Sequence, residues 1–149
     1  MRIALALLVA SVVTACGGSD STSDGTNVPF TTVAQSNYSA VTAREGVVAR
    51  SQSELNAVWA RHSANLSPPP QPPVIDFNAL QVVGFFLGNR ANGCYSMSIS
   101  RVTQTSDRLV VTYIEQVPAA NAVCTQAIVN PSHLVAVPKS QLQVEFLAE

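Results

Sequence analysis

The chain has 149 residues, enough for one domain with a hydrophobic core of its own. Only 11% of the residues are charged, and eight basic residues nearly balance nine acidic ones. The composition shows no basic patch, which argues against a nucleic-acid-binding protein. With Lys139 as the single lysine, the surface must consist mainly of Ser, Thr, Gln and Asn.

The first 15 residues have the features of a lipoprotein signal peptide. Arg2 supplies a positive start, and residues 3–13 are apolar and uncharged. This run is too short for a membrane-spanning helix, which needs about 20 residues, but it suits a signal peptide. Small residues follow and end at Cys16. We therefore expect residues 1–15 to be removed and the Cys16 thiol to carry a diacylglycerol; an ordinary secretory signal with an incidental cysteine is the alternative.

A polar tether is expected after Cys16. Residues 17–27 contain only Gly, Ser, Asp, Thr and Asn, so we assign residues 16–29 to a flexible tether and residues 30–149 to one folded domain. Removal of residues 1–15 leaves seven basic and nine acidic residues, a formal charge of −2. The lipid on Cys16 predicts a lipid-anchored protein of the bacterial cell envelope. Because Gly17 rather than an aspartate follows the cysteine, we expect the outer membrane, with its side left open.

Cys94 and Cys124 are the other two cysteines. In an oxidising compartment such a pair is expected to form a disulfide, and a loop of about 30 residues would stabilise the domain by ~3.5–4 kcal/mol in the loop-entropy model. Two free thiols are the alternative. We expect no metal site, because no neighbouring histidine completes a tetrahedral shell, and no cofactor.

The first half of the domain contains one predicted helix. Residues 30–50 are expected to be extended, with a short strand at Val47–Ala49. Ser51 and Glu54 form a capping box, which predicts that a helix starts there. The helical spacing of apolar residues predicts that this helix buries Trp59 against a sheet. Residues 67–73, rich in proline, should run as polyproline II.

The second half is predicted to consist of strands. Leu80–Leu87 is almost wholly apolar, which indicates a strand buried on both faces, and Tyr95–Ser100 alternates like a half-buried strand. Further strands are expected over residues 109–117, 123–129, 133–137 and 144–147. One helix followed by closely connected strands predicts an α+β domain, a mainly antiparallel β-sheet with one α-helix packed on it.

No catalytic constellation is present. The chain lacks the GxSxG, HExxH, Walker and GxGxxG motifs. His133 and Asp107 fit a Ser-His-Asp triad on paper, but many serines would complete it, so this choice carries no weight. We therefore expect no catalytic residue and no enzyme activity.

The loop of residues 88–95 is the candidate partner-binding site. Loops between strands often present Arg and main-chain groups to a partner, and this one offers Gly88, Asn89, Arg90, Asn92, Gly93 and Tyr95. A glycine-demanding turn with Tyr95 packed inward is the alternative. Pro131 and His133 form a second candidate, for which a simple turn is again the alternative.

Three blocks of the sequence resemble the PrcB C-terminal domain family over residues 45–147. They are Arg50-Ser51-Gln52 with Glu54 and Trp59; Phe85 to Arg90 with Gly93 and Tyr95; and Thr125-Gln126-Ala127 with Pro131, His133 to Val135 and Val137-Pro138. The blocks come in the family's order. Cys94 departs from the family's usual Gly-Gly-Tyr and supplies a partner for Cys124.

The resemblance implies an accessory or scaffold role. The family's namesake is a lipoprotein subunit that associates with and stabilises a surface protease complex. We therefore expect a non-enzymatic, membrane-anchored lipoprotein that binds or stabilises an envelope or surface protein, with a secreted protease as the candidate partner. The alternatives are a small-molecule or peptide-binding lipoprotein, and a protease inhibitor acting through the 88–95 loop.

Overall fold

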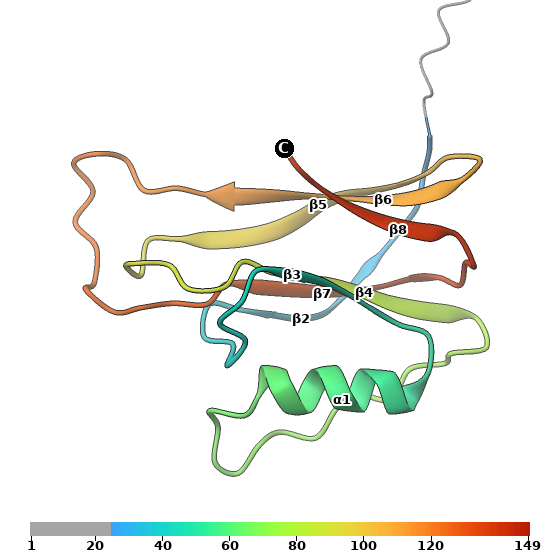
Figure 1. Ribbon diagram of the computed structural model, residues 1–149, viewed down its shortest axis with the longest axis horizontal. Helices are drawn as coiled ribbons and strands as arrows, with labels where there is room; N and C mark the ends of the chain where they lie inside the picture. The colour runs from blue at the N-terminus through green and yellow to red at the C-terminus, as the bar shows by residue number, and fades with distance from the viewer. Residues whose placement is uncertain (1–24) are drawn as a thin grey trace, which may run out of the picture.

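Two four-stranded sheets pack face to face, with one helix on the outer side of the second sheet (Figure 1). The computed structural model describes residues 25–149, so the expected signal peptide, Cys16 and residues 17–24 of the expected tether lie outside the described residues. Sheet A has the strand order β1-β5-β6-β8, and sheet B has the order β2-β7-β4-β3. Within residues 25–149, no helix is both long and apolar enough to cross a membrane.

The chain is mostly β-structure. The elements in order are β1 (Thr26–Asn27), β2 (Thr31–Ser36), β3 (Glu45–Ala49), α1 (Gln52–His62), β4 (Leu80–Phe86), β5 (Ser96–Gln104), β6 (Arg108–Gln116), β7 (Ser132–Pro138) and β8 (Gln143–Ala148). The paired strands are antiparallel except β6 and β8, which run parallel. The expected single sheet is therefore two sheets, because a sequence pattern shows the buried faces of a strand but not its neighbours.

Strand β4 has one face toward sheet A and the other toward the helix. Val83 and Phe85 belong to the core between the sheets, whereas Val82 and Phe86 pack with Leu55 of α1. Alternate side chains of a strand point to opposite faces, so a strand between two cores must be apolar throughout. The expectation of a strand buried on both faces is confirmed.

The start of α1 follows the predicted capping box. Ser51 is the N-cap, and its hydroxyl accepts the Glu54 N–H at 3.2 Å. The Glu54 carboxylate in turn accepts the Arg50 N–H at 2.6 Å. The Ser51 bond satisfies a main-chain donor that the first helical turn leaves unpaired, whereas Glu54 binds the residue just before the N-cap.

The expectation that Trp59 is buried against a sheet is wrong. Leu55 is the fully buried side chain of α1. Trp59 is half-buried, and its indole N–H donates to the Pro70 carbonyl at 2.8 Å. The proline-rich segment therefore receives the indole ring, because a Trp N–H needs an acceptor that the apolar inner face of α1 does not provide.

Two expected boundaries change. Thr26 and Asn27 pair with Gln104 and Thr103, and Val28 is buried, so the folded part starts inside the region expected to be tether. The expected strand over residues 123–129 is not formed, and residues 117–128 make a long loop instead. A disulfide and a main-chain hydrogen bond attach this loop to the 88–95 loop, and it pairs with no strand.

Candidate functional site

The loops of residues 88–95 and 117–128 meet at one end of the sandwich. Cys94 and Cys124 form a disulfide with their Cα atoms 5.5 Å apart, which confirms the expected pairing. Nearby, the Gly93 N–H donates to the Thr125 carbonyl at 3.0 Å. The main chains of Arg90 and Val129 exchange two further hydrogen bonds, at 2.8 and 3.0 Å. The two loops therefore form one braced unit, which we call the loop end.

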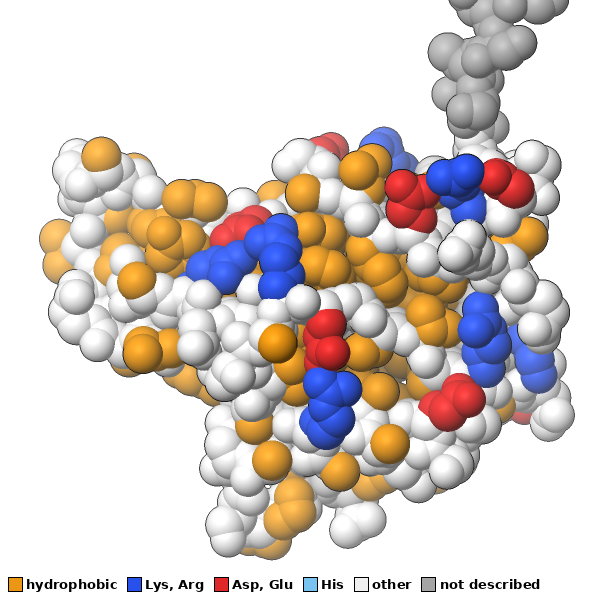
Figure 2. Space-filling view, in the orientation of Figure 1, with side chains coloured by type: hydrophobic (Ala, Val, Ile, Leu, Met, Phe, Trp, Pro, Cys, Tyr) orange, Lys and Arg blue, Asp and Glu red, His pale blue; other side chains and the backbone are white. Residues whose placement is uncertain are grey.

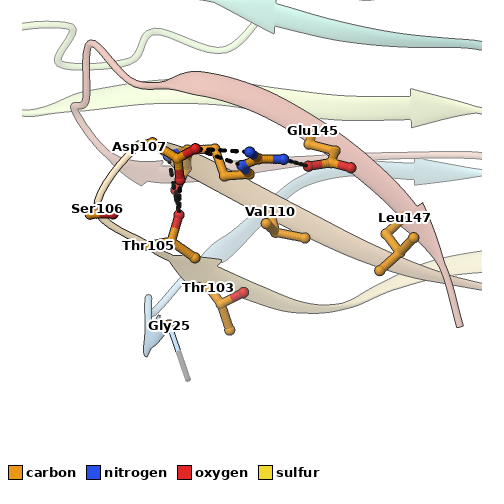
Figure 3. Close-up of a pocket in the computed structure, with 9 residues that line it drawn as sticks. Gly25, Thr103, Thr105, Ser106, Asp107, Val110, Glu145 and Leu147 are labelled. Atoms are coloured by element: carbon orange, nitrogen blue, oxygen red, sulfur yellow. Dashed lines mark hydrogen bonds and ion pairs between the residues drawn. The ribbon is translucent and has the colours of Figure 1, made fainter. Parts of the chain in front are cut away.

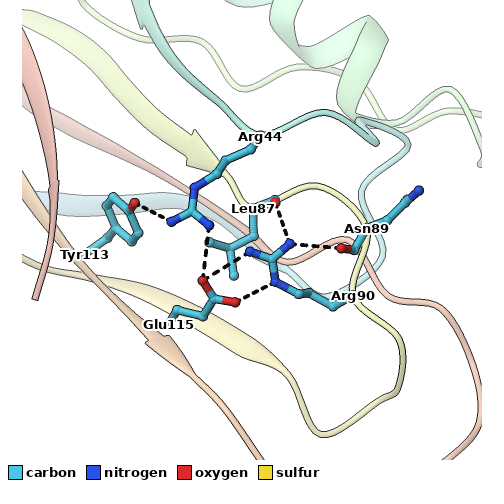
Figure 4. Close-up of polar contacts among 6 residues, drawn as sticks. All are labelled: Arg44, Leu87, Asn89, Arg90, Tyr113 and Glu115. Atoms are coloured by element: carbon cyan, nitrogen blue, oxygen red, sulfur yellow. Dashed lines mark hydrogen bonds and ion pairs between the residues drawn. The ribbon is translucent and has the colours of Figure 1, made fainter.

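Arg90 is held inside the loop end (Figure 4). Its guanidinium binds Glu115 through two contacts, Nε to Oε1 at 2.5 Å and Nη2 to Oε2 at 3.1 Å. Its Nη1 also donates to the carbonyls of Leu87 and Asn89, each at 2.9 Å. This bonding lowers the pKa of the Glu115 carboxyl, with the Arg90 hydrogen bonds as the largest cause. The side chain proposed for partner binding thus fixes the loop to β6.

Arg44 joins the same cluster and was missed by the sequence analysis. Its Nη2 donates to the Tyr113 hydroxyl at 2.7 Å, and its Nη1 to Glu115 at 3.3 Å. The guanidinium carbon lies 5.6 Å from the centres of both the Phe85 and Tyr113 rings. Tyr113 and Glu115 lie 69 and 71 residues beyond Arg44, and no local motif links them to it. Two guanidinium groups share one carboxylate, which leaves a net positive charge.

The other predicted residues of the 88–95 loop hold the loop in place. Gly88 has a φ of +71°, and an added Cβ would lie 2.6 Å from the Thr42 carbonyl oxygen, so the turn requires glycine. An added Cβ on Gly93 would collide with the Thr125 hydroxyl. Asn92 accepts the Cys94 N–H at 3.1 Å.

Asn89 is exposed, whereas Tyr95 is half-buried. Pro131 is buried, and its carbonyl accepts the Leu87 N–H at 2.9 Å. The structure therefore brings Pro131 next to the 88–95 loop as a packing residue. Of the eight predicted partner-binding residues, Asn89 alone is exposed, and the other seven are buried or half-buried.

His133 is buried between the two sheets. Its Nδ1 accepts the main-chain N–H of Ile99 at 2.9 Å, and its Nε2 lies 2.9 Å from the Thr32 hydroxyl. Burial lowers the pKa of the ring. Both ring nitrogens are thus occupied, whereas Asp107 is bonded to Arg108 in the β5–β6 turn. The structure does not bring His133 and Asp107 into a triad, and residues 25–149 contain no group of three or more side chains suited to a metal ion.

Exposed apolar side chains mark the loop end. Val117 is 63% exposed, Ile128 67% and Val123 fully exposed. We call these three residues the loop-end patch. Figure 2 shows apolar side chains gathered over this left-hand end of the molecule. Sequence reasoning missed the patch because it assigned residues 123–129 to a strand, in which alternate apolar residues would be buried.

The chain enters the described domain at the opposite end of the sandwich (Figure 1). Gly25 lies beside Gln104 and lines a shallow concavity of about 450 Å³ with residues of the β5–β6 turn (Figure 3). Arg108 crosses this region and binds Asp107 and Glu145, each at 2.8 Å. The hydrogen bonds from Arg108 are the main reason that the pKa of Asp107 falls to about 2.

The fold and the loop end define a β-rich α+β domain with a braced, apolar loop surface. Residues 81–138 match the family model described as PrcB C-terminal. This match spans β4 to β7, including the 88–95 loop, the disulfide and His133, and it confirms the family resemblance over these residues. No curated protein and no solved structure matches the chain.

Proposed function

We propose that the protein is a non-enzymatic lipoprotein of the cell envelope that binds or stabilises another envelope or surface protein. A secreted protease is the candidate partner. The match to the PrcB C-terminal family supports a protease-associated accessory role. The lipobox ending at Cys16 supports anchoring of the mature chain to a membrane.

The loop-end patch is the observation that carries this proposal. Large exposed apolar side chains on a braced surface are typical of protein-binding sites. Val117, Val123 and Ile128 have few rotamers to lose on binding, and the disulfide already restricts the loop, so the cost of ordering side chains and loop on association is small. A new contact would therefore gain most of the free energy of burying these side chains.

The position of the patch suits an anchored protein. A tether of residues 16–24 spans at most ~30 Å when fully extended. It would join the domain at Gly25, at the end of the sandwich opposite the loop end. In this arrangement the loop-end patch lies at the end of the domain remote from the tether, where a second protein has access to it.

The surroundings of His133 argue against its use as a general base. A general base must be free to take a proton from a substrate. His133 instead accepts the Ile99 N–H through Nδ1 and contacts Thr32 through Nε2, within the core between the sheets. This arrangement uses the ring as a structural element, which agrees with a binding role for the protein.

The test is affinity capture of the tagged full-length chain from membranes of its own host after cross-linking in cells. We expect the wild type to recover a defined partner protein. The double variant Val123→Asp, Ile128→Asp should lose this partner, because each carboxylate would be desolvated at the interface. Val74→Asp is the matched control, since Val74 is 91% exposed in the proline-rich segment. Repeated recovery of the wild-type chain alone would refute the proposal.

The anchor is tested separately. Mass spectrometry of the mature chain should find an acylated Cys16 at the N-terminus, and Cys16→Ala should move the protein from the membrane to the soluble fraction. If the mature chain instead begins at a residue other than Cys16 and carries no lipid, the signal is an ordinary secretory one. This result would remove the lipid from the proposal without affecting partner capture.

A further inference from the structure

The edge of strand β5 that faces away from β6 is covered by β1 and by side chains of sheet B. Unpaired N–H and C=O groups along a sheet edge tend to pair with other strands, and proteins usually block them. Strand β1 pairs with one end of β5. Farther along, His133 accepts the Ile99 N–H, and the Gln35 amide donates to the Met97 carbonyl at 2.9 Å. Side chains of sheet B therefore replace a neighbouring strand at this edge.

Strand β8 forms the other edge of sheet A and pairs with β6 on one side. The Glu149 N–H donates to the Tyr113 carbonyl at 2.9 Å, toward β6. Because main-chain groups of successive residues point to opposite sides of a strand, those of Val144, Phe146 and Ala148 point away from β6. The side-chain hydrogen bonds found within residues 25–149 leave these three positions uncovered, whereas Arg50 covers the carbonyls of Ser140 and Leu142 just before the strand.

Arg44 lies beyond the C-terminal end of β8, against side chains of its paired strand β6. Tyr113, whose hydroxyl binds Arg44, is in register with Ala148 of β8. The Phe85 ring under Arg44 lies 5.4 Å from the Phe146 ring. Figure 4 shows β8 passing beside Tyr113, with Arg44 on the other side of its hydroxyl.

The Arg44 guanidinium has binding capacity left for an anion. Its hydrogen bonds to Tyr113 and Glu115 use two of the five N–H donors of an arginine. Its side chain is 47% exposed. Glu115 makes its shorter contacts with Arg90, so the charge of Arg44 is only partly compensated. A carboxylate is the group that matches such a planar pair of donors.

We propose that the outer edge of β8 receives an extended, acidic segment of a partner polypeptide as an additional strand, with Arg44 binding a carboxylate of that segment. The main-chain groups of Val144, Phe146 and Ala148 provide the strand pairing, and Arg44 provides the preference for an acidic residue. A second copy of this chain fits less well, because the Glu145 carboxylate of its β8 is already bound by Arg108. The proposal rests on the proposed function only in taking the partner to be a protein.

The test uses a displayed library of random ten-residue peptides, selected against the lipid-anchored chain in detergent. We expect the selected peptides to alternate apolar and polar residues and to contain Asp or Glu near one end. NMR-detected amide exchange of the complex should show new protection at Val144, Phe146 and Ala148 and little change at Glu145 and Leu147. This alternation is the signature of strand addition, since the intervening amides already face β6.

Two pairs of variants test the two parts of the site. Ala148→Pro removes one outward N–H, whereas Ala148→Val keeps it; we expect at least tenfold weaker peptide binding for the first and under twofold change for the second. Arg44→Gln should weaken binding of acidic peptides about tenfold and leave Asp→Asn versions of those peptides unaffected. Arg101→Gln is the matched control, because Arg101 is exposed on β5.

Several results would overturn the proposal. These are a selection without enrichment, protection confined to the loop end, continuous protection along β8, or a concentration-dependent dimer that is lost in Ala148→Pro. The proposed function is judged independently by capture from host membranes. A partner still captured by Ala148→Pro and Arg44→Gln would leave the proposed function intact and refute the β8 edge as its site.

Discussion

The Nδ1 atom of His133 on β7 accepts the main-chain N–H of Ile99 on β5 at a distance of 2.9 Å. A side chain of one sheet thus satisfies a main-chain donor at the edge of the other. Nδ1 must be unprotonated to accept this bond, so the ring is neutral with its proton on Nε2, facing the Thr32 hydroxyl. The hydrogen bond that joins the two sheets is therefore lost when the His133 ring is protonated.

This bond predicts that the protein loses stability in mild acid. Burial lowers the pKa of His133 in the folded chain below the ordinary value near 6.5. Between those two values the unfolded chain binds more protons, so the free energy of unfolding falls as the pH falls. We expect a constant Tm above about pH 7 and a decline below about pH 6.5.

The variant His133→Asn tests whether this residue is responsible. Asparagine keeps an acceptor near the position of Nδ1 but does not titrate, so the decline should be smaller. His62 is also buried enough to have a lowered pKa and should account for part of the remaining decline. Equal pH dependence of Tm in the wild type and His133→Asn would contradict the prediction.

The Arg90–Glu115 contact should contribute to stability rather than to partner binding alone. Arg90→Ala removes two contacts to Glu115 and the donor to the Leu87 and Asn89 carbonyls. We expect a loss of ~1.5–3 kcal/mol in the free energy of unfolding, measured in urea. Arg90→Lys should recover part of this, because an ammonium cannot form the paired contact. A loss as small as that of Arg101→Ala would show that the pair is dispensable.

Loss of the Cys94–Cys124 disulfide should loosen the loop end. The double variant Cys94→Ser, Cys124→Ser should be less stable by ~2–4 kcal/mol. It should also be cut faster by proteases within residues 117–128, because the loop loses its covalent brace. Limited proteolysis with mass spectrometry locates the cuts. Cleavage at the same rate as in the oxidised wild type would mean that the main-chain bonds between the loops suffice.

The Arg108 side chain should control the acidity of Asp107. The pKa of Asp107 is held at about 2, mainly by hydrogen bonds from Arg108, so Arg108→Gln should return it toward 3.8. Because the folded value is the lower one, any stabilisation is present above the ordinary pKa and is lost as the pH falls toward 2. Titration of the carboxyl carbon by NMR measures the shift, and Arg101→Gln serves as control. An Asp107 pKa unchanged by Arg108→Gln would assign the effect to the Thr105 hydroxyl.

Local patterns in the sequence predicted much of the secondary structure. The Ser51 and Glu54 pair placed the helix start, and the apolar run from Leu80 identified the doubly buried strand. The strand expected over residues 123–129 failed, because its apolar residues belong to an exposed loop. Composition alone does not separate a buried apolar segment from a braced, exposed one.

The candidate site was predicted only in part. The 88–95 loop and its disulfide partner were identified, but Arg90 was assigned to a partner and is bound to Glu115 instead. Arg44 was not considered, because nothing near it in the sequence distinguishes it. Its neighbours Tyr113 and Glu115 come from a strand about 70 residues later, and such contacts depend on how the sheets pack.

The sequence by itself determined the features that depend on short-range chemistry: the capping box, the alternation of strands, the two cysteines available for pairing, and the expectation of a lipid-carrying Cys16. Tertiary structure alone decided the division into two sheets, the burial of His133 against Ile99 and the open edge of β8. The physical reason is that hydrogen bonds between strands are made by main-chain groups common to all residues. Which edge is paired and which remains open is therefore decided by the packing of the whole domain.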